Sequence, residues 1–434
     1  MRFLCVGIVF SGLGLEMGVA YAEEISAGYI INKANLSKAD QQTFDGHNLG
    51  AMITPVQRKM ITELNLTIKL APTKPMAVPS NYLAMTEKYS KNVKYDRATR
   101  RVSGYVAGLP FPELSESDPD LANKIIWNQF YGNALNTDTY LVTTQIMTID
   151  AVKGVERSVV LTNPMLKLKH RYSVEPIAPK VVGDGEIYRK VLMFNLAPQD
   201  VAGTGAYIQR YDDGRVDDSW AYIKSVRRIR RMSGGTWMDP VPGLAIVNDD
   251  TSCYDSFPTW YPSPPKVVAK QWVLAIGHGV PPGGSGYKME NYIDLKNPPY
   301  WNLINQPWEP REVFVVDTFP PEGHPYSRRR IYYDIQAKVI LHCEMYNKKG
   351  ELWKIFALPF AEHLMADGQS GSGGLAIWVV DFQFMRANYG PITYGRLNDP
   401  KVEPDDLSSD SLSHPERFTV EALTKRFGPP TFKH

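Results

Sequence analysis

The sequence predicts an α+β protein that is mainly β, built on one large, twisted antiparallel sheet. From about residue 137 onward, runs rich in β-branched and aromatic residues follow one another along the chain, as expected of strands. Turn signals separate several runs: Asp213-Gly214 and Asn347-Lys-Lys-Gly350 are typical of hairpins. Because hairpins place consecutive strands side by side, we expect a single extended antiparallel sheet with helices covering one face.

Residues 1–22 have the three zones of a secretory signal peptide. Arg2 precedes an apolar run from Phe3 through Leu15, and Ala20-Tyr21-Ala22 supplies the small residues that a signal peptidase requires. The run is too short for a transmembrane helix, and a buried N-terminal helix rarely combines these three zones. We therefore expect an exported protein that is cleaved after Ala22.

Along the chain, helices are expected both before the first strand and after the last strand of the predicted sheet. Asp118 is a suitable N-cap and Pro119 suits a first helical position, while Leu121 and Ile125 contribute to one apolar face. Residues 60–71 alternate apolar and polar in places, which favours a half-buried strand. The expected helical segments are 37–40, 79–89, 118–130 and a closing helix at 415–427.

The predicted strands occupy most of the chain between residues 139 and 397. They are Thr139–Ile149, Ser158–Leu166, Lys190–Leu196, Gly205–Tyr211, Ser219–Arg231, Val267–Ile276, Arg311–Phe319, Arg329–Gln336, Lys338–Tyr346, Leu352–Leu358, Asp381–Ala387 and Ile392–Leu397. Pro-rich stretches at 258–265 and 280–310 should lie on the surface. We expect one large domain over 23–434, with a mixed helical part at 23–136, the sheet at 137–400 and a tail at 401–434.

Composition and compartment restrict the function. The chain is 43% hydrophobic and 22% charged, as in ordinary globular proteins, and its formal net charge is +2. This charge gives no support for a nucleic-acid partner, and nicotinamide cofactors and ATP are not routinely available to an exported protein. After residue 22 no apolar run reaches 18 residues, so we expect no membrane-spanning helix. No cofactor is expected.

Two cysteines remain after removal of the signal peptide, which carries Cys5. Cys253 and Cys343 could form a disulfide in an oxidising compartment. They could equally be two buried thiols that pack as small hydrophobic groups. We slightly favour the thiols, because so large a domain does not need a disulfide for stability.

No motif predicts a catalytic or metal site. Gly368–Gly374 begins like a nucleophile elbow, but Ser372 stands where the second glycine should be and no helix pattern follows, so a flexible loop is favoured. His342-Cys343-Glu344 would alternate between the faces of a strand and could not converge on one ion. The acidic residues around Asp213-Gly214 lack the spacing of a calcium loop. We expect a protein that is not an enzyme.

Two arginine clusters, Arg227–Arg231 and Arg328–Arg330, lie within predicted strands. Alternation puts neighbouring arginines on opposite faces, so some of their charges should lie over the covered face and need carboxylate partners. We favour cross-strand ion pairing over a role in anchoring a ligand. The candidate partners by strand order are Asp217, Asp218, Glu312 and Asp317.

Several segments together resemble a family of exported Gram-negative bacterial proteins. They include Tyr105–Pro112, Asp118-Pro119 with Lys124–Asn128, Trp220–Ile223 with Val226–Arg231, Asp249-Asp250, Trp308–Val316, Tyr326–Asp334 and Tyr346 with Gly350–Trp353. The chain resembles domain of unknown function 1329, which is grouped with the lipoprotein-sorting proteins of the LolA/LolB type. It departs from the family pattern at Lys224, where a proline is usual, and at both cysteines.

This resemblance implies a strongly curved antiparallel sheet, like an incomplete barrel, with helices covering its concave face. It also implies a periplasmic carrier or chaperone for a lipid, a lipoprotein or another hydrophobic cargo. The alternative is a non-catalytic accessory subunit of an outer-membrane protein or lipid-exporting transporter, with the stretch 280–310 as its contact surface. The proposed ligand-binding residues are Trp220, Tyr222, Trp237, Trp272, Arg228 and Arg230.

Overall fold

The computed structural model describes residues 23–132, 136–224, 226–234, 236–241, 243–281 and 288–431. The predicted signal peptide therefore lies outside the described residues. Within the described part, no helix is long and apolar enough to cross a membrane.

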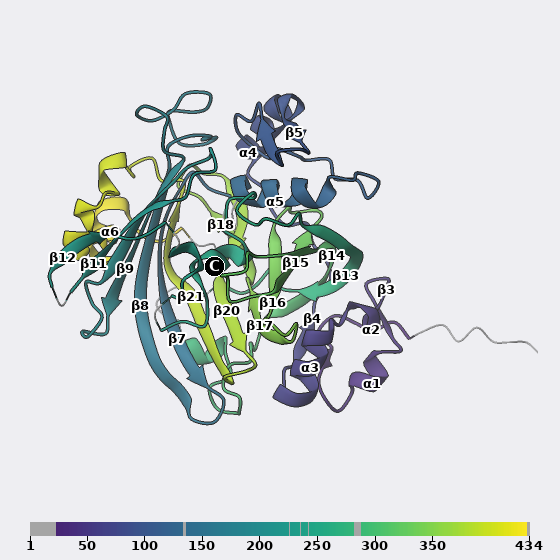
Figure 1. Cartoon of the computed structure of the whole chain (residues 1–434). Helices are drawn as coiled ribbons and strands as arrows, with labels where there is room; N and C mark the ends of the chain where they lie inside the picture. Colours follow the sequence, from purple (N-terminus) through teal and green to yellow (C-terminus); the bar gives the residue numbers. More distant parts are fainter. Residues whose placement is uncertain are drawn as a thin grey trace, which may run out of the picture.

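One sheet of fifteen strands dominates the described chain (Figure 1). In spatial order it contains β1 (Ile30–Ile31), β4 (Ile68–Leu70), β14 (Pro307–Thr318), β15 (Arg328–Asp334), β16 (Ile340–Tyr346), β17 (Leu352–Ala357), β20 (Ala376–Asp381), β21 (Arg386–Leu397), β7 (Thr139–Asp150), β8 (Gly154–Lys167), β9 (Arg189–Ala197), β10 (Gly205–Arg210), β11 (Asp218–Ile223) and β12 (Arg228–Arg231). The fifteenth strand, β13 (Lys266–Ala275), also pairs with β14. Every pairing in this sheet is antiparallel except that of β4 with β14, and among the described strands the sheet does not close into a barrel.

Helices and short strand pairs complete the structure. The helices are α1 (Leu36–Ala39), α2 (Leu49–Met52), α3 (Pro55–Leu64), α4 (Ser80–Tyr89), α5 (Leu121–Gly132) and α6 (Val420–Phe427). Short 3-10 helices are η1 (Ser90–Asn92), η2 (Thr236–Met238), η3 (Asn248–Cys253), η4 (Met289–Asn291), η5 (Pro404–Asp406), η6 (Asp410–Ser413) and η7 (Pro415–Phe418). Three hairpins lie apart from the large sheet: β2 (Thr43–Phe44) with β3 (His47–Asn48), β5 (Lys94–Asp96) with β6 (Arg101–Ser103), and β18 (Phe360–Leu364) with β19 (Ser370–Gly374).

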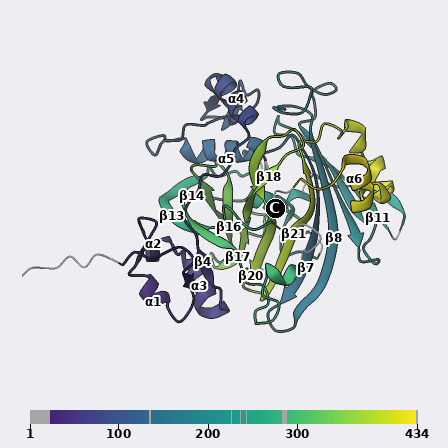
Figure 2. The ribbon, with the colours of Figure 1, turned by 180° about the vertical axis from the view of Figure 1, so that it is seen from behind.

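The register of the sheet defines its two faces, because side chains alternate along each strand. On β7, Leu141 and Met147 share the outer face. Leu141 packs with residues of the C-terminal segment that includes α6, and Met147 belongs to the cluster formed with α1, α2 and α3. The N-terminal helices and α6 thus cover separate parts of the outer face (Figure 2).

The inner face is covered by α5 and by the plug, which we define as residues 236–241 and 243–261. Ile125 of α5 and Tyr254 of the plug pack with Ile331 on β15, Cys343 on β16 and Phe356 on β17 in one fully buried cluster. The sheet curves around this material (Figure 1). The expected helix on the concave face is therefore present, but helices cover the outer face as well, and much of the inner cover is irregular chain.

Several sequence predictions are confirmed. Helix α4 occupies 80–89 of the expected 79–89, and α5 (121–132) covers most of the expected 118–130. The predicted N-cap Asp118 and first helical residue Pro119 are wrong, because the helix begins only at Leu121. Both predicted hairpin turns are present, with Gly214 and Gly350 at positive φ. Most predicted strands are found with their ends shifted by a few residues.

The prediction of a strand over 60–71 is wrong for most of its length. Helix α3 runs to Leu64 and only Ile68–Leu70 is a strand. The decisive signal precedes the predicted strand: Thr54 and Gln57 form a reciprocal capping box, with Pro55 at the first helical position. A helix started there continues through residues whose local alternation suggested a strand.

Other differences concern two predicted strands, a predicted loop and a short predicted helix. The predicted strand Asp381–Ala387 spans the turn between β20 and β21, where Asp381 Oδ1 accepts from Gln383 N. The predicted strand Ser219–Arg231 is interrupted between Ile223 and Arg228. The expected flexible loop Gly368–Gly374 instead supplies β19, and its Ser372 hydroxyl accepts a hydrogen bond from Ala77 N. Residues 37–40 form only the four-residue turn of α1.

Trp378 belongs to the outer core, the buried cluster between the N-terminal helices and the outer face of the sheet. Its side chain is 1% exposed and its Nε1 donates to Trp301 O at 2.8 Å. We expect Trp378→Ala to lower the free energy of unfolding by about 3–5 kcal/mol, because it leaves a large cavity. In urea titrations, Phe384→Ala, at a side chain that is 69% exposed, should stay within about 0.5 kcal/mol of the wild type. Equal losses in the two variants would contradict this account of the outer core.

Candidate ligand-binding face

The inner face has a second half that no core cluster covers. It consists of parts of strands β8–β11, between the plug and the last strand, β12. We define the inner wall as six half-buried apolar side chains: Leu161, Val191, Met193, Ala206, Ile208 and Ala221. Among the described residues, none of the six belongs to a buried hydrophobic cluster or packs against one.

Strand register shows that the five side chains on β9–β11 form a continuous surface, while Leu161 on β8 is opposite Asn195. Met193 on β9 pairs with Ala206 on β10, which pairs with Ala221 on β11. Val191 pairs with Ile208 one row away. Directly opposed residues of antiparallel strands lie on the same face, so these side chains are lateral neighbours. On an antiparallel sheet with one solvated face, polar residues would be expected at such positions.

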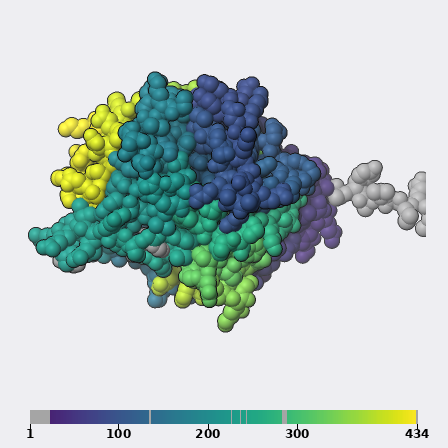
Figure 3. Space-filling view, turned by 45° about the horizontal axis from the view of Figure 1, so that its top comes forward, coloured from purple at the N-terminus to yellow at the C-terminus, as the bar shows by residue number. Residues whose placement is uncertain are grey.

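The plug borders the inner wall along one side and at one end. Along the side, Thr148 Oγ1 donates to Gly243 O and Asn388 Oδ1 accepts from Ala245 N, at 3.2 and 2.6 Å. At the end, Asp255 of the plug pairs with Arg189 of β9 and Arg210 of β10. On the far side the wall reaches the free edge formed by β12, and β11 and β12 (teal) lie at the margin of the molecule (Figure 3).

A buried ion cluster fixes the plug to β15. The Arg329 guanidinium is fully buried, and its Nη2 contacts Asp249 Oδ1 at 2.9 Å and Asp250 Oδ1 at 2.6 Å. Asp249 Oδ2 also accepts hydrogen bonds from the hydroxyls of Tyr261 and Ser256, at 2.7 and 3.0 Å. Both carboxylates belong to the plug, so the charge on the sheet is neutralised only when the plug is in place.

The environment of this cluster favours the charged forms of its members. Burial by itself would raise the pKa of Asp249, but the charge of Arg329 and the hydrogen bond from His324 outweigh it and lower the pKa below its usual range. Burial likewise opposes the charge on Arg329, yet Asp249, Tyr261 and Asp250 together raise its pKa well above the ordinary value. The cluster is therefore an ion pair at neutral pH.

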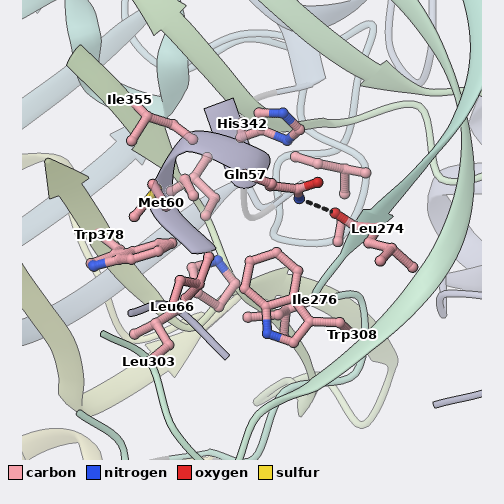
Figure 4. A pocket seen from close by; sticks show the side chains of 15 residues that line it. Gln57, Met60, Leu66, Leu274, Ile276, Leu303, Trp308, His342, Ile355 and Trp378 are labelled. Atoms are coloured by element: carbon pink, nitrogen blue, oxygen red, sulfur yellow. Dashed lines mark hydrogen bonds between the residues drawn. The ribbon is translucent and has the colours of Figure 1, made fainter. Parts of the chain in front are cut away.

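The enclosed cavity shown in Figure 4 is too small for an acyl chain. It lies beneath α3, where Met60, Trp308 and Trp378 are among its lining residues and Gln57 Nε2 donates to Leu274 O at 2.7 Å. Its volume of about 20 Å³ is room for about one water molecule.

A larger hollow of about 440 Å³ lies along β13. Its lining includes four charged side chains, Glu116, Asp118, Lys266 and Lys270. Because charged groups are costly to remove from water, this hollow is a poor site for hydrocarbon.

The proposed aromatic residues are dispersed in the structure. Trp220 and Tyr222 are on β11 but face outward, where they pack against the C-terminal segment. Trp237 packs against the core cluster of the plug, 5.4 Å from Trp260 between ring centroids. Trp272 stacks on His47 at 3.8 Å on the outer side. None of these four tryptophan and tyrosine side chains is part of the inner wall.

Arg228 and Arg230 lie on β12, beside the inner wall. Arg230 pairs in register with Ala221, and Arg228 pairs with Ile223. Both side chains are exposed. Of the residues proposed from the sequence, these two arginines are the ones that border the wall.

The prediction of ion pairs for the arginine clusters is confirmed in part. Arg330 pairs with Asp317 at 2.8 Å across β14 and β15, and Arg231 pairs with Asp218. Arg329 differs, because its partners come from the plug rather than from a neighbouring strand. A buried arginine in the sheet was predicted correctly, but Asp249 and Asp250 were not among its predicted partners.

The two cysteines are neighbouring free thiols, both fully buried. Cys343 Sγ donates to Cys253 O at 3.7 Å, which joins β16 to the plug. Burial raises the pKa of the Cys253 thiol well above its ordinary value, so this side chain is a poor nucleophile.

The inner wall was not predicted, because the candidate binding residues were aromatic side chains and two arginines. Small and aliphatic residues on alternate positions of β9 and β10 carry the surface instead. The signal was present: Val191-Leu-Met193 and Ala206-Tyr-Ile208 are apolar on both faces, whereas a strand with one solvated face alternates with polar residues.

The fold and the wall define a mainly β protein with an open, plugged sheet and an uncovered apolar face. Residues 30–423 match the family described as "Protein of unknown function (DUF1329)", and the chain belongs to this family. No match was found among curated proteins.

Solved structures give only weak likenesses. A putative outer membrane lipoprotein-sorting protein domain from Vibrio parahaemolyticus is 15% identical, with a TM-score of 0.42 over 64% of this chain and 92% of that one. A DUF1329 family protein from Desulfovibrio piger is 14% identical, with the same TM-score and coverage. A LolA superfamily protein from Nitrosomonas europaea is 12% identical, with a TM-score of 0.39 over 67% and 98%. Likenesses at this level assign no ligand to the chain.

The ion cluster predicts a specific loss of stability in acid. The pKa of Asp249 is lower in the folded protein than in the unfolded chain, so its contribution is complete above the unfolded value, about pH 4, and is lost as the pH falls through the folded value. We expect Asp249→Asn to be about 3 kcal/mol less stable than the wild type at pH 7, because it breaks a buried pair. As the pH falls below 4, the stability of the variant should also decline less than that of the wild type.

Urea titrations at neutral and acid pH measure both effects. Asp405→Asn is the matched control, since Asp405 is exposed in the C-terminal segment, and it should behave as the wild type at pH 7. If the free energy of unfolding of Asp249→Asn fell in acid as much as that of the wild type, this carboxylate would not be what holds the plug.

Proposed function

We propose that the protein is a periplasmic carrier or chaperone that holds a lipid, or the acyl chains of a lipoprotein, on the inner wall. The observation that carries this proposal is the half-buried apolar surface of β8–β11, which no described core cluster covers. Burial of apolar area contributes about 25 cal/mol per Å² without directional chemistry, so such a surface can retain a hydrocarbon chain against water.

The chemistry of the wall supports binding rather than catalysis. Its six side chains are aliphatic or thioether groups, with no nucleophile and no acid or base among them. The predicted signal peptide supports export, and a hydrophobic molecule that crosses an aqueous compartment needs a protein surface to cover it. The proposed role therefore combines the predicted compartment with the half-buried apolar surface.

Native mass spectrometry of protein purified from the periplasm without detergent tests this proposal. We expect the wild type to carry adducts with the masses of lipids, or to bind a fluorescent fatty acid after their removal. Leu161→Glu should reduce this binding strongly, because it places a charge on the β8 side of the apolar wall.

Val152→Glu provides the control, since Val152 is 82% exposed in the turn between β7 and β8. This variant has the same change of charge and should retain the cargo. A wild-type protein that is free of adducts and also fails to bind fatty acid would reject the carrier function. A stable protein partner recovered with such a cargo-free protein would favour an accessory subunit instead.

A further inference from the structure

The edge strand β12 places two arginines at the margin of the inner wall. Arg230 is directly opposite Ala221, which continues through Ala206 to Met193 in the same row of the sheet. Arg228 is opposite Ile223. Both guanidinium groups therefore lie on the face of the wall, where the apolar surface meets solvent.

These two arginines differ from the other arginines of the sheet in having no carboxylate partner among the described residues. Arg231, the next residue on the same strand, faces outward and pairs with Asp218. Arg330 pairs with Asp317, and Arg210 pairs with Asp217 at 2.7 Å. Arg228 and Arg230 are exposed and make no ion pair with the described chain, so their charge is available to a ligand.

The spacing of the two side chains suits one phosphate group. Residues i and i+2 of a strand project from the same face roughly 7 Å apart, and long arginine side chains can converge across that distance. Each guanidinium offers a planar set of donors that matches phosphate oxygens, and charge-assisted bonds of this kind are stronger than neutral ones. A lone fatty-acid carboxylate would offer fewer acceptors to the pair.

The size of the wall suits the rest of a phospholipid. From β12 to β8 the sheet spans four inter-strand spacings, roughly 19 Å. One acyl layer of a bilayer is about 15 Å thick, half of the hydrocarbon core. A chain that starts beside Arg230 can therefore lie along Ala221, Ala206 and Met193 and remain on the wall.

We propose that Arg228 and Arg230 bind the phosphate of an acidic phospholipid whose acyl chains lie on the inner wall. This inference rests on the proposed carrier function and specifies its cargo. The headgroup stays at the free edge of the sheet, in contact with water, while the chains extend toward the plug. Cargo with a net negative headgroup is therefore preferred over zwitterionic cargo with the same chains.

Calorimetric titration with short-chain phospholipids below their micelle-forming concentration tests the preference. Phosphatidylglycerol and phosphatidylcholine with identical acyl chains are compared, and glycerol phosphate serves as the headgroup without chains. We expect the wild type to bind phosphatidylglycerol about tenfold more tightly than phosphatidylcholine, a difference of about 1.4 kcal/mol. This difference should shrink as salt is added, and glycerol phosphate alone should bind far more weakly.

Arg230→Glu and Arg231→Glu form a matched pair, since they change the same charge on adjacent residues of one strand but on opposite faces. Arg230→Glu, alone or with Arg228→Glu, should abolish the preference for phosphatidylglycerol. It should weaken binding of phosphatidylglycerol more than binding of phosphatidylcholine, because the choline cation offsets the charge of its own phosphate. Arg231→Glu should keep the preference. Equal loss in the two single variants would show that net charge alone is responsible and would overturn the inference.

The same titrations separate this inference from the carrier function. If the wild type binds both lipids equally and Leu161→Glu abolishes both, the wall is a lipid site but the arginines do not select the headgroup. If the wild type binds neither lipid, the carrier function itself is rejected. Binding of glycerol phosphate as tightly as phosphatidylglycerol would show an anion site that does not use the wall, and would also overturn the inference.

Discussion

The ion pairs of Arg329 with Asp249 and Asp250 determine how the inner face of the sheet is divided. An arginine at a fully buried position of β15 is tolerated only if its charge is compensated. Because both carboxylates come from the plug, the sheet and the plug depend on each other. The plug is thereby fixed over β13–β17, and the strands beyond β7 are left without a comparable cover.

The two halves of the inner face consequently differ in packing although they belong to one sheet. Ile331, Cys343 and Phe356 in the covered half are at most 1% exposed. Met193 and Ile208 in the other half are only half-buried, with equally apolar side chains. A difference in sequence pattern does not explain this contrast; the position of the plug does.

Much of the fold is readable from the sequence, because hairpins are local structures. The turn residues Gly214 and Gly350 and the runs beside them predict β10, β16 and β17 with small errors at their ends, and they predict the start of β11. What the sequence could not show are relations between distant segments. The partnership of Arg329 with Asp249 joins residues from different elements, and no local pattern indicates it.

The candidate site was harder to predict for the same reason. Whether an apolar residue on β9 is packed or uncovered depends on where the plug and the C-terminal segment come to lie. Leu192 and Met193 are neighbours in sequence and both apolar, yet Leu192 is fully buried under the C-terminal segment and Met193 belongs to the wall. Trp220 was an attractive candidate by residue type, but the register places it on the outer face.

The strand order also means that the sheet can finish folding only after late segments of the chain have been made. Lys69 of β4 pairs with Pro307 of β14, and Tyr140 of β7 pairs with Leu397 of β21. A chain that is synthesised from its N-terminus exposes these early segments long before their partners are made. Folding with so many distant contacts is slow, and unpaired apolar strands tend to aggregate in the meantime. A nascent chain of this protein therefore exposes unpaired apolar strands until residue 397 has been made.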